Sequence, residues 1–305
     1  MPIEIVLSLM LVILAGFVVH RLKILPAETT MVLNKFLVNI SFPLVIFLGI
    51  AKSDLSKIND FLPFVLINCA IISAAYVVVF LIGKLLKLNY ARSGALVLGA
   101  VTGNIAFMGF PVIKGFFGTA HVEFAYMYII VFSMTLAFVG LTLVELSQDD
   151  QKIDFKKILK KGLLNPLTMS AILGTIALLL QIKFPAVVLD PATSLSQVTT
   201  PLALFSIGGF ISANFKLQEI KLTLLAVVIK LALLPLLVLV VYSLFKGDVQ
   251  TAFTVSVMQA AMPTSLTELA IASEYKLDGK IASSTILLTT LLSPLTLVLW
   301  ATVLR

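Results

Sequence analysis

Two apolar stretches of the sequence are interrupted by residues whose types could bind a charged solute. The interrupting residues are Gly103, Asn104, Ile105 and Pro111 in the first stretch, and Met262, Pro263 and Thr264 in the second. Glycine and proline are poor helix-interior residues, and proline also frees a backbone carbonyl. Inside a bilayer, such unpaired groups need a partner or must face a cavity. The half-helix N-termini that result suit a carboxylate, and the freed carbonyls suit a cation.

A simple kink, satisfied by neighbouring serine and threonine side chains, is the alternative for either interruption alone. The two interruptions fall at equivalent places, because subtracting 158 from 263 gives 105. For a symmetric pair near the membrane midplane, with Asn104 beside one of its members, we favour a binding site over two unrelated kinks.

Charged residues inside apolar segments form a second group of candidates for support or ion coupling. A charge at the position of Lys230 costs about 2.5–3.5 kcal/mol on membrane-insertion scales, so it should be paired or functional. Lys230 either supports the interrupted helices or attracts an anion; the alternative is that it extends its ammonium towards the membrane surface or is neutral within the bundle. Glu268 could pair with Lys230, carry a proton or bind sodium together with Gln259; a structural ion pair is an equal alternative.

Polar residues also precede two further prolines within apolar segments. Asn39 and Ser41 precede Pro43, and Thr199 and Thr200 precede Pro201; of these we expect Asn39 and Thr200 to line the substrate cavity. The alternative is that these side chains only satisfy backbone groups freed by the prolines.

The elements that must position these residues are membrane-spanning helices. Of the 305 residues, 60% are hydrophobic and 12% are charged, against about 25% charged in soluble proteins. A span of the hydrocarbon layer needs about 20 apolar residues. We expect an all-α membrane protein with ten spans and a first span that is retained. The segments are 3–20, 30–50, 61–86, 91–118, 121–147, 163–182, 194–213, 219–245, 249–274 and 279–303.

The distribution of basic residues predicts the orientation of the chain. Loops on one side carry 14 lysines and arginines and loops on the other side carry 6. The positive-inside rule places the richer side in the cytoplasm and both termini outside. The lysine-rich stretch 148–162 is then a cytoplasmic linker, either solvated or lying on the membrane surface. The net charge of +7 therefore does not indicate nucleic-acid binding.

The two halves, residues 1–147 and 163–305, resemble each other at a fixed offset. Residues 43–47, Pro-Leu-Val-Ile-Phe, match residues 201–205, Pro-Leu-Ala-Leu-Phe, at an offset of 158, which Gly16 and Gly174 share. An odd number of helices per repeat forces the second repeat to enter the membrane upside down, as in many secondary transporters. Chance similarity between apolar helices is the alternative.

Three motifs resemble patterns of the auxin efflux carrier family. They are Gly-Asn-Ile-Ala-Phe-Met-Gly-Phe-Pro at 103–111, Thr-Pro-Leu-Ala-Leu-Phe-Ser-Ile-Gly at 200–208 and Ala-Ala-Met-Pro-Thr at 260–264. The resemblance covers nearly the whole chain, and its length is similar to bacterial members, which are mainly described as malate or malonate permeases. It implies ten helices in a fold shared with bile-acid sodium symporters, crossing at the fourth and ninth.

The resemblance also implies a scaffold of helices 1, 2, 6 and 7 and a moving bundle of helices 3–5 and 8–10, assembled from both repeats. It further implies a homodimer formed through the scaffold. On this basis we expect a permease for a small organic anion, such as malate or malonate, that works by alternating access. We expect it in the bacterial plasma membrane.

Enzyme and exchanger classes receive less support from the residues. His20 and His121 are far apart, the single Cys69 lies in an apolar segment, and no His-Glu-x-x-His motif is present, so we expect neither an enzyme nor a metal. We expect no cofactor apart from sodium or proton coupling. A sodium- or proton-coupled exchanger or symporter of related fold is the alternative, although residues 129–133 lack the carboxylate such exchangers use. A channel stays open as well.

Overall fold

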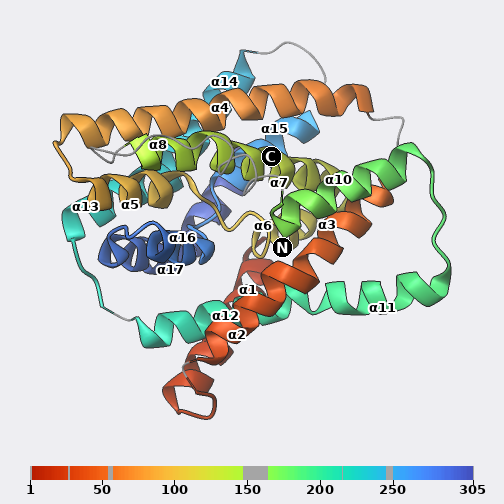
Figure 1. Cartoon of the computed structure of the whole chain (residues 1–305), viewed down its shortest axis with the longest axis horizontal. Coiled ribbons are helices and arrows are strands. Elements are labelled where there is room, and N and C mark those ends of the chain that lie inside the picture. Colours follow the sequence, from red (N-terminus) through yellow and green to blue (C-terminus); the bar gives the residue numbers. More distant parts are fainter. Residues whose placement is uncertain are drawn as a thin grey trace.

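The computed structural model describes residues 2–26, 28–53, 58–146, 164–214, 216–244 and 250–304. Every regular element within these ranges is a helix (Figure 1). The predicted linker 148–162 and its lysines lie outside the described residues.

The helices of the first half follow one another with short connections. They are α1 (Pro2–Arg21), α2 (Thr29–Phe36), the π-helix η1 (Leu37–Ser41), α3 (Phe42–Ala51), α4 (Ile58–Leu85), α5 (Tyr90–Val101), α6 (Gly109–Phe117), the 3-10 helix η3 (Thr119–His121), α7 (Val122–Thr135), the π-helix η4 (Leu136–Gly140) and α8 (Leu141–Leu146).

The second half also contains both long helical runs and interrupted ones. Its helices are α10 (Pro166–Leu179), α11 (Ala186–Gln197), α12 (Thr199–Ala213), α13 (Ile220–Val228), the π-helix η5 (Ile229–Leu233), α14 (Leu234–Ser243), α15 (Gln250–Ala260), α16 (Thr267–Glu274) and α17 (Gly279–Val303). The helical run that ends at Ala213 begins at Ala186, earlier than the predicted start at 194, because helix continues through the less apolar Asp190 and Pro191.

Seven helical runs within the described ranges are long and apolar enough to cross a membrane. They are Glu4–Arg21, Thr29–Ala51, Phe61–Leu85, Thr119–Leu146, Ala186–Ala213, Ile220–Ser243 and Gly279–Val303. α10 is apolar but shorter. Large apolar side chains on their outer faces are exposed, for example Leu7 and Leu11 on α1 and Leu173 on α10. This surface suits lipid and would be unfavourable in water.

One group of helices is held together by close backbone contacts at glycines. α1 packs along α12, and α3 packs along α10. A Cβ atom added at Gly208 would collide with the carbonyl oxygen of Ile13, and one added at Gly16 would collide with the carbonyl oxygen of Phe205. Small residues allow helix backbones in a membrane to approach this closely. These helices occupy one side of the molecule in Figure 1.

The remaining helices form a second group around the two interrupted runs. α4 packs against α5 and α7, α14 against α15, and α17 against α5 and α13. A buried polar cluster joins three of them: Asn68 on α4 and Ser256 on α15 donate hydrogen bonds of 2.8 and 3.0 Å to the hydroxyl oxygen of Tyr242 on α14. The cluster therefore fixes the relative position of these helices.

Replacing Tyr242 with phenylalanine should lower the stability of the protein by about 1–3 kcal/mol, because the donors of Ser256 and Asn68 lose a buried acceptor. Thermal unfolding of the purified protein in detergent measures the effect. Thr302→Val is the control, since that exposed hydroxyl bonds to carbonyls of its own helix, those of Val298 and Leu299. An equal melting temperature for Tyr242→Phe and the wild type would contradict the prediction.

Candidate functional site

The two interrupted helical runs meet at their breaks. α5 ends at Val101 and α6 begins at Gly109, while α15 ends at Ala260 and α16 begins at Thr267. The backbone N–H of Asn104 donates a 2.6 Å hydrogen bond to the carbonyl oxygen of Pro263. The two non-helical segments, residues 102–108 and 261–266, therefore touch near their centres. Four helix termini converge at this place, which we call the crossing.

The peptide groups freed at the breaks are satisfied by each other and by neighbouring helices. Thr264 donates its hydroxyl proton to the carbonyl oxygen of Gly99 at 2.8 Å, and its N–H donates to the hydroxyl of Thr289 at 3.0 Å. The N–H groups of Met108 and Gly109 both donate to the carbonyl oxygen of Asn104 at 3.2 Å. Because these groups are paired, irregular backbone is tolerated in the interior of the helix assembly.

Lys230 lies beside the C-terminal ends of α5 and α15, the helices that precede the two breaks. Its ammonium donates to the carbonyl oxygen of Ala260 at 2.9 Å and to that of Val101 at 3.3 Å. The residue is only 1% exposed and is carried by the π-helix η5. Of the roles predicted for it, the geometry matches direct support of the interrupted helices.

Five polar side chains at or beside the crossing have atoms without a hydrogen-bond partner within the described part of the chain. They are Thr102 and Thr285 through Oγ1, Asn104 through Oδ1, Gln259 through both amide atoms and Glu268 through both carboxyl oxygens. All five residues are at most 3% exposed. A Cβ atom at Gly109 would collide with Oε1 of Gln259, so this amide lies at the start of α6. Buried polar atoms of this kind call for a ligand, an ion or water.

Glu268 is separate from Lys230. It lies in the first turn of α16, and a Cβ atom added at Gly99 would be 3.1 Å from its Oε1 and 3.3 Å from the methyl group of Thr285. The predicted pairing with Lys230 is not present, since neither carboxyl oxygen of Glu268 has a partner among the described residues. Lys230 instead donates hydrogen bonds to the backbone carbonyl oxygens of Val101 and Ala260.

The other predicted site residues divide into buried and outlying ones. Gly103, Ile105, Met262, Pro263 and Thr264 are buried at the crossing, and Pro111 is half-buried in the first turn of α6. Thr200 is half-buried near the start of α12. Asn39 is exposed and bonds the carbonyl oxygen of Lys35, one turn earlier in its own helix.

The neighbouring polar residues, Ser41 and Thr199, face each other between the two halves of the chain. The hydroxyl of Ser41 bonds the hydroxyl of Thr199 and donates to the carbonyl oxygen of Leu195 at 2.7 Å. Thr289 was not singled out from the sequence, although it accepts the bond from Thr264. The polar positions Thr285 and Thr289, four apart in an apolar segment, mark one helix face and were the available signal.

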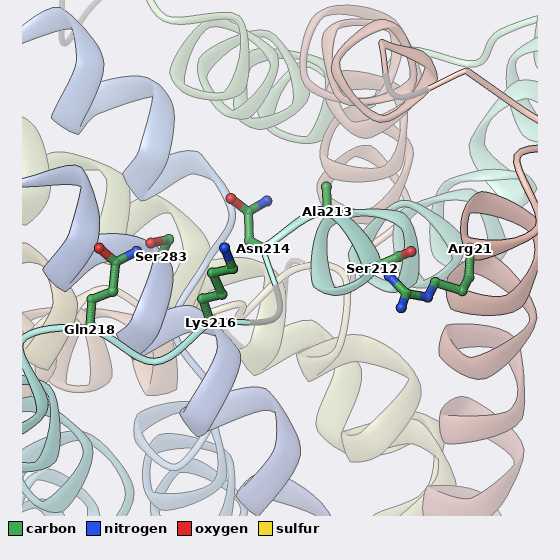
Figure 2. Close-up of a pocket in the computed structure, with 7 residues that line it drawn as sticks. All are labelled: Arg21, Ser212, Ala213, Asn214, Lys216, Gln218 and Ser283. Carbon is green, nitrogen blue, oxygen red and sulfur yellow. The ribbon is translucent and has the colours of Figure 1, made fainter.

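A polar hollow of about 280 Å³ lies away from the crossing, between the C-terminal ends of α1 and α12 and the N-terminal end of α17. It is lined by Arg21, Ser212, Ala213, Asn214, Lys216, Gln218 and Ser283. Figure 2 shows Arg21 and Ser212 at one side, Gln218 and Ser283 at the other, and Asn214 and Lys216 between them. Two of these seven side chains are cationic and none is acidic, so the hollow attracts anions.

Comparison with known proteins identifies the family of the chain. The chain matches the family model described as "Membrane transport protein" over residues 2–301. It is 28% identical to an "Uncharacterized transporter" of Methanothermobacter thermautotrophicus, across 99% of this chain and 98% of the relative. It is 25% identical to a "Putative malonate transporter" of Rhizobium meliloti, across 92% and 89%.

A plant protein matches part of the chain. The "Probable auxin efflux carrier component 9" of rice is 32% identical over 146 residues, which are 46% of this chain and 34% of the relative. The family model covers almost the entire sequence, and the relatives named above are transporters or carriers by name. The chain therefore belongs to the membrane transport protein family, that of the auxin efflux carriers, and is a membrane-spanning transporter rather than an enzyme.

Proposed function

We propose that the protein carries a small organic anion, a carboxylate such as malate or malonate, across the membrane by alternating access at the crossing. The observation that carries this proposal is the meeting of the two breaks, with Asn104 bonded to Pro263 through its backbone and unpaired through its side-chain oxygen among the described residues. The N-termini of α6 and α16 begin at these breaks and carry partial positive charge. The "Putative malonate transporter" among the relatives supports the same substrate class.

The proposed ten spans form two inverted repeats. Seven continuous runs, α10 and the two interrupted pairs α5–α6 and α15–α16 make ten crossings. Contacts between the halves support a two-fold relation. Gly16 packs on Phe205, and Gly174 packs on Phe47, and adding 158 to 16 and to 47 gives 174 and 205. Ser41 and Thr199, which bond each other, are also 158 positions apart.

The contacts also support a division into a scaffold and a moving bundle. α1, α2, α3 and α10–α12 would form the scaffold, and α4–α8 with α13–α17 the bundle. Between them lie mainly apolar contacts, such as the Phe42 and Phe107 rings, whose centroids are 5.0 Å apart. Apolar side chains can slide past one another without breaking hydrogen bonds, as a rocking motion requires. A homodimer formed through the scaffold is part of the proposal and rests on the family resemblance.

The orientation completes the proposed route. With both termini outside a bacterial plasma membrane, the hollow beside Arg21 and Lys216 faces the cytoplasm. It then collects anions at the mouth between scaffold and bundle. Asn39 and Thr200, predicted on the scaffold side of the cavity, would join the route only in another state of the cycle.

The second candidate, an ion-coupled exchanger or symporter, is favoured by one observation. Glu268 is a fully buried carboxyl group without a hydrogen-bond partner among the described residues. An ionised carboxylate in this position is costly, so a proton or a cation must accompany it. Glu268 and Gln259 are therefore the proposed coupling residues if transport proves to be ion-driven.

Reconstitution tests the proposed function. The purified protein in lipid vesicles should take up labelled malate or malonate in a saturable manner, and vesicles preloaded with unlabelled substrate should show counterflow. Aromatic acids and uncharged analogues, such as the corresponding diamides, define the substrate class. An open pore would give uptake without counterflow, and absence of saturable uptake for every anion would contradict the proposal.

A further inference from the structure

The two helix ends that surround the Lys230 ammonium would attract a cation. An α-helix carries about half a negative charge at its C-terminus, so two such ends facing one point present about one unit of negative charge. α5 and α15 end in this way at Val101 and Ala260, and the carbonyl oxygens of these two residues both accept hydrogen bonds from the Lys230 ammonium. One ammonium therefore neutralises the pair.

Within the described ranges, no acidic side chain shares this role. Glu268, the carboxyl group predicted to pair with Lys230, has no hydrogen bond to it, and the Lys230 residue is 1% exposed. The charge of the ammonium is therefore compensated by main-chain dipoles. Without it, two sets of terminal carbonyls would face each other in a medium where unpaired polar groups are expensive.

In secondary transporters, unwound backbone and half-helix C-terminal ends commonly coordinate the coupling cation. We infer that in this chain the side chain of Lys230 permanently occupies that position, so that the crossing binds no sodium and any ion coupling through Glu268 uses protons. This inference rests on the proposed carrier function and deepens it. η5, which carries Lys230, packs against α5 and α17 within the proposed moving bundle, so the ammonium travels with the crossing and is never released.

A nearby glycine fits the same arrangement. A Cβ atom at Gly103 would lie 3.0 Å from the Lys230 nitrogen. Glycine thus leaves room for the ammonium beside the break, whereas a larger residue would press on it.

Thermal unfolding of the purified protein tests the inference without requiring a known substrate. The wild type should melt at the same temperature in sodium, potassium and choline chloride of equal ionic strength. Lys230→Ala should melt several degrees lower and should regain stability with propylammonium, which matches the removed atoms and restores the charge. Propanol, of the same length but uncharged, should not restore it. Lys35→Ala, which removes the exposed lysine of α2, is the matched control and should respond to neither compound.

Two results would overturn the inference. One is a sodium-specific rise in the melting temperature of the wild type, or a sodium requirement for its anion uptake in vesicles. The other is equal stabilisation of Lys230→Ala by propanol and propylammonium, which would mean that only packing was lost. If Lys230→Ala does not fold, the wild-type sodium comparison still decides. A failure of anion uptake with these unfolding results intact would count against the carrier proposal alone.

Discussion

Asn104→Asp is expected to reduce anion uptake about 100-fold or more. A carboxylate in place of the amide puts a negative charge beside the bound anion, and like-charge juxtaposition costs several kcal/mol, where each 1.4 kcal/mol is about tenfold in affinity. The substitution preserves shape. The hydrogen bond from residue 104 to Pro263 uses the backbone N–H, so the crossing itself should survive. The loss is therefore assigned to the anion and not to the fold.

Initial rates of uptake in vesicles, with equal protein incorporation verified by gel, measure this effect. Asn165→Asp is the matched control, because Asn165 is exposed at the start of α10 and aspartate can replace it as the helix N-cap. We expect that variant to transport at nearly the wild-type rate. Asn104→Ala should fall between the two, since it removes the polar contact without adding a charge. Wild-type uptake by Asn104→Asp would remove the crossing from the substrate route.

The second large effect is expected from a single methyl group at Gly208. An added Cβ there would overlap the carbonyl oxygen of Ile13 and lie within 3 Å of its carbonyl carbon. Backbone atoms cannot rotate away, so α1 and α12 must separate along their whole contact. Overpacking costs typically about 1–3 kcal/mol and more where the obstacle is rigid, so Gly208→Ala should lose about 3 kcal/mol or more. Most of the protein should then be misfolded or aggregated.

Size-exclusion chromatography in detergent and thermal unfolding report this outcome. Gly279→Ala provides the comparison, since no described atom lies within 4 Å of a Cβ atom at that position and its backbone is ordinary. That variant should elute and melt like the wild type. If Gly208→Ala gives the same sharp peak and melting temperature as Gly279→Ala, the close contact between α1 and α12 is incorrect.

The membrane spans, the two breaks and the importance of Lys230 could be predicted from the sequence because each depends on local chemistry. The length and apolar content of the segments indicate helices that cross a bilayer, because lipid rewards such segments wherever they occur in the chain. The breaks at 102–108 and 261–266 were likewise predictable, since glycine and proline disturb a helix through their own backbone geometry. Lys230 was identified as important because its charge is expensive in any apolar segment.

The hydrogen-bond partners of these residues could not be predicted, because they depend on which helix faces pack together, and the sequence around each residue does not specify this. Lys230 bonds Val101, 129 positions away, and Thr264 bonds Gly99, 165 positions away. A position on an apolar helix does not reveal its neighbour, because nearly every face of such a helix is acceptable to lipid or to another helix. The same ambiguity explains why Asn39 was expected to face inward and is exposed instead.

Residue types alone thus decided that this chain crosses membranes and where two of its spans break, because burial in lipid and proline geometry act on each segment separately. Three-dimensional packing decided that Lys230 serves two helix ends, that Glu268 stays apart from it, and that Ser41 meets Thr199. Those pairings arise only when distant segments are brought together, and the free energy that selects them comes from satisfying buried polar groups between helices.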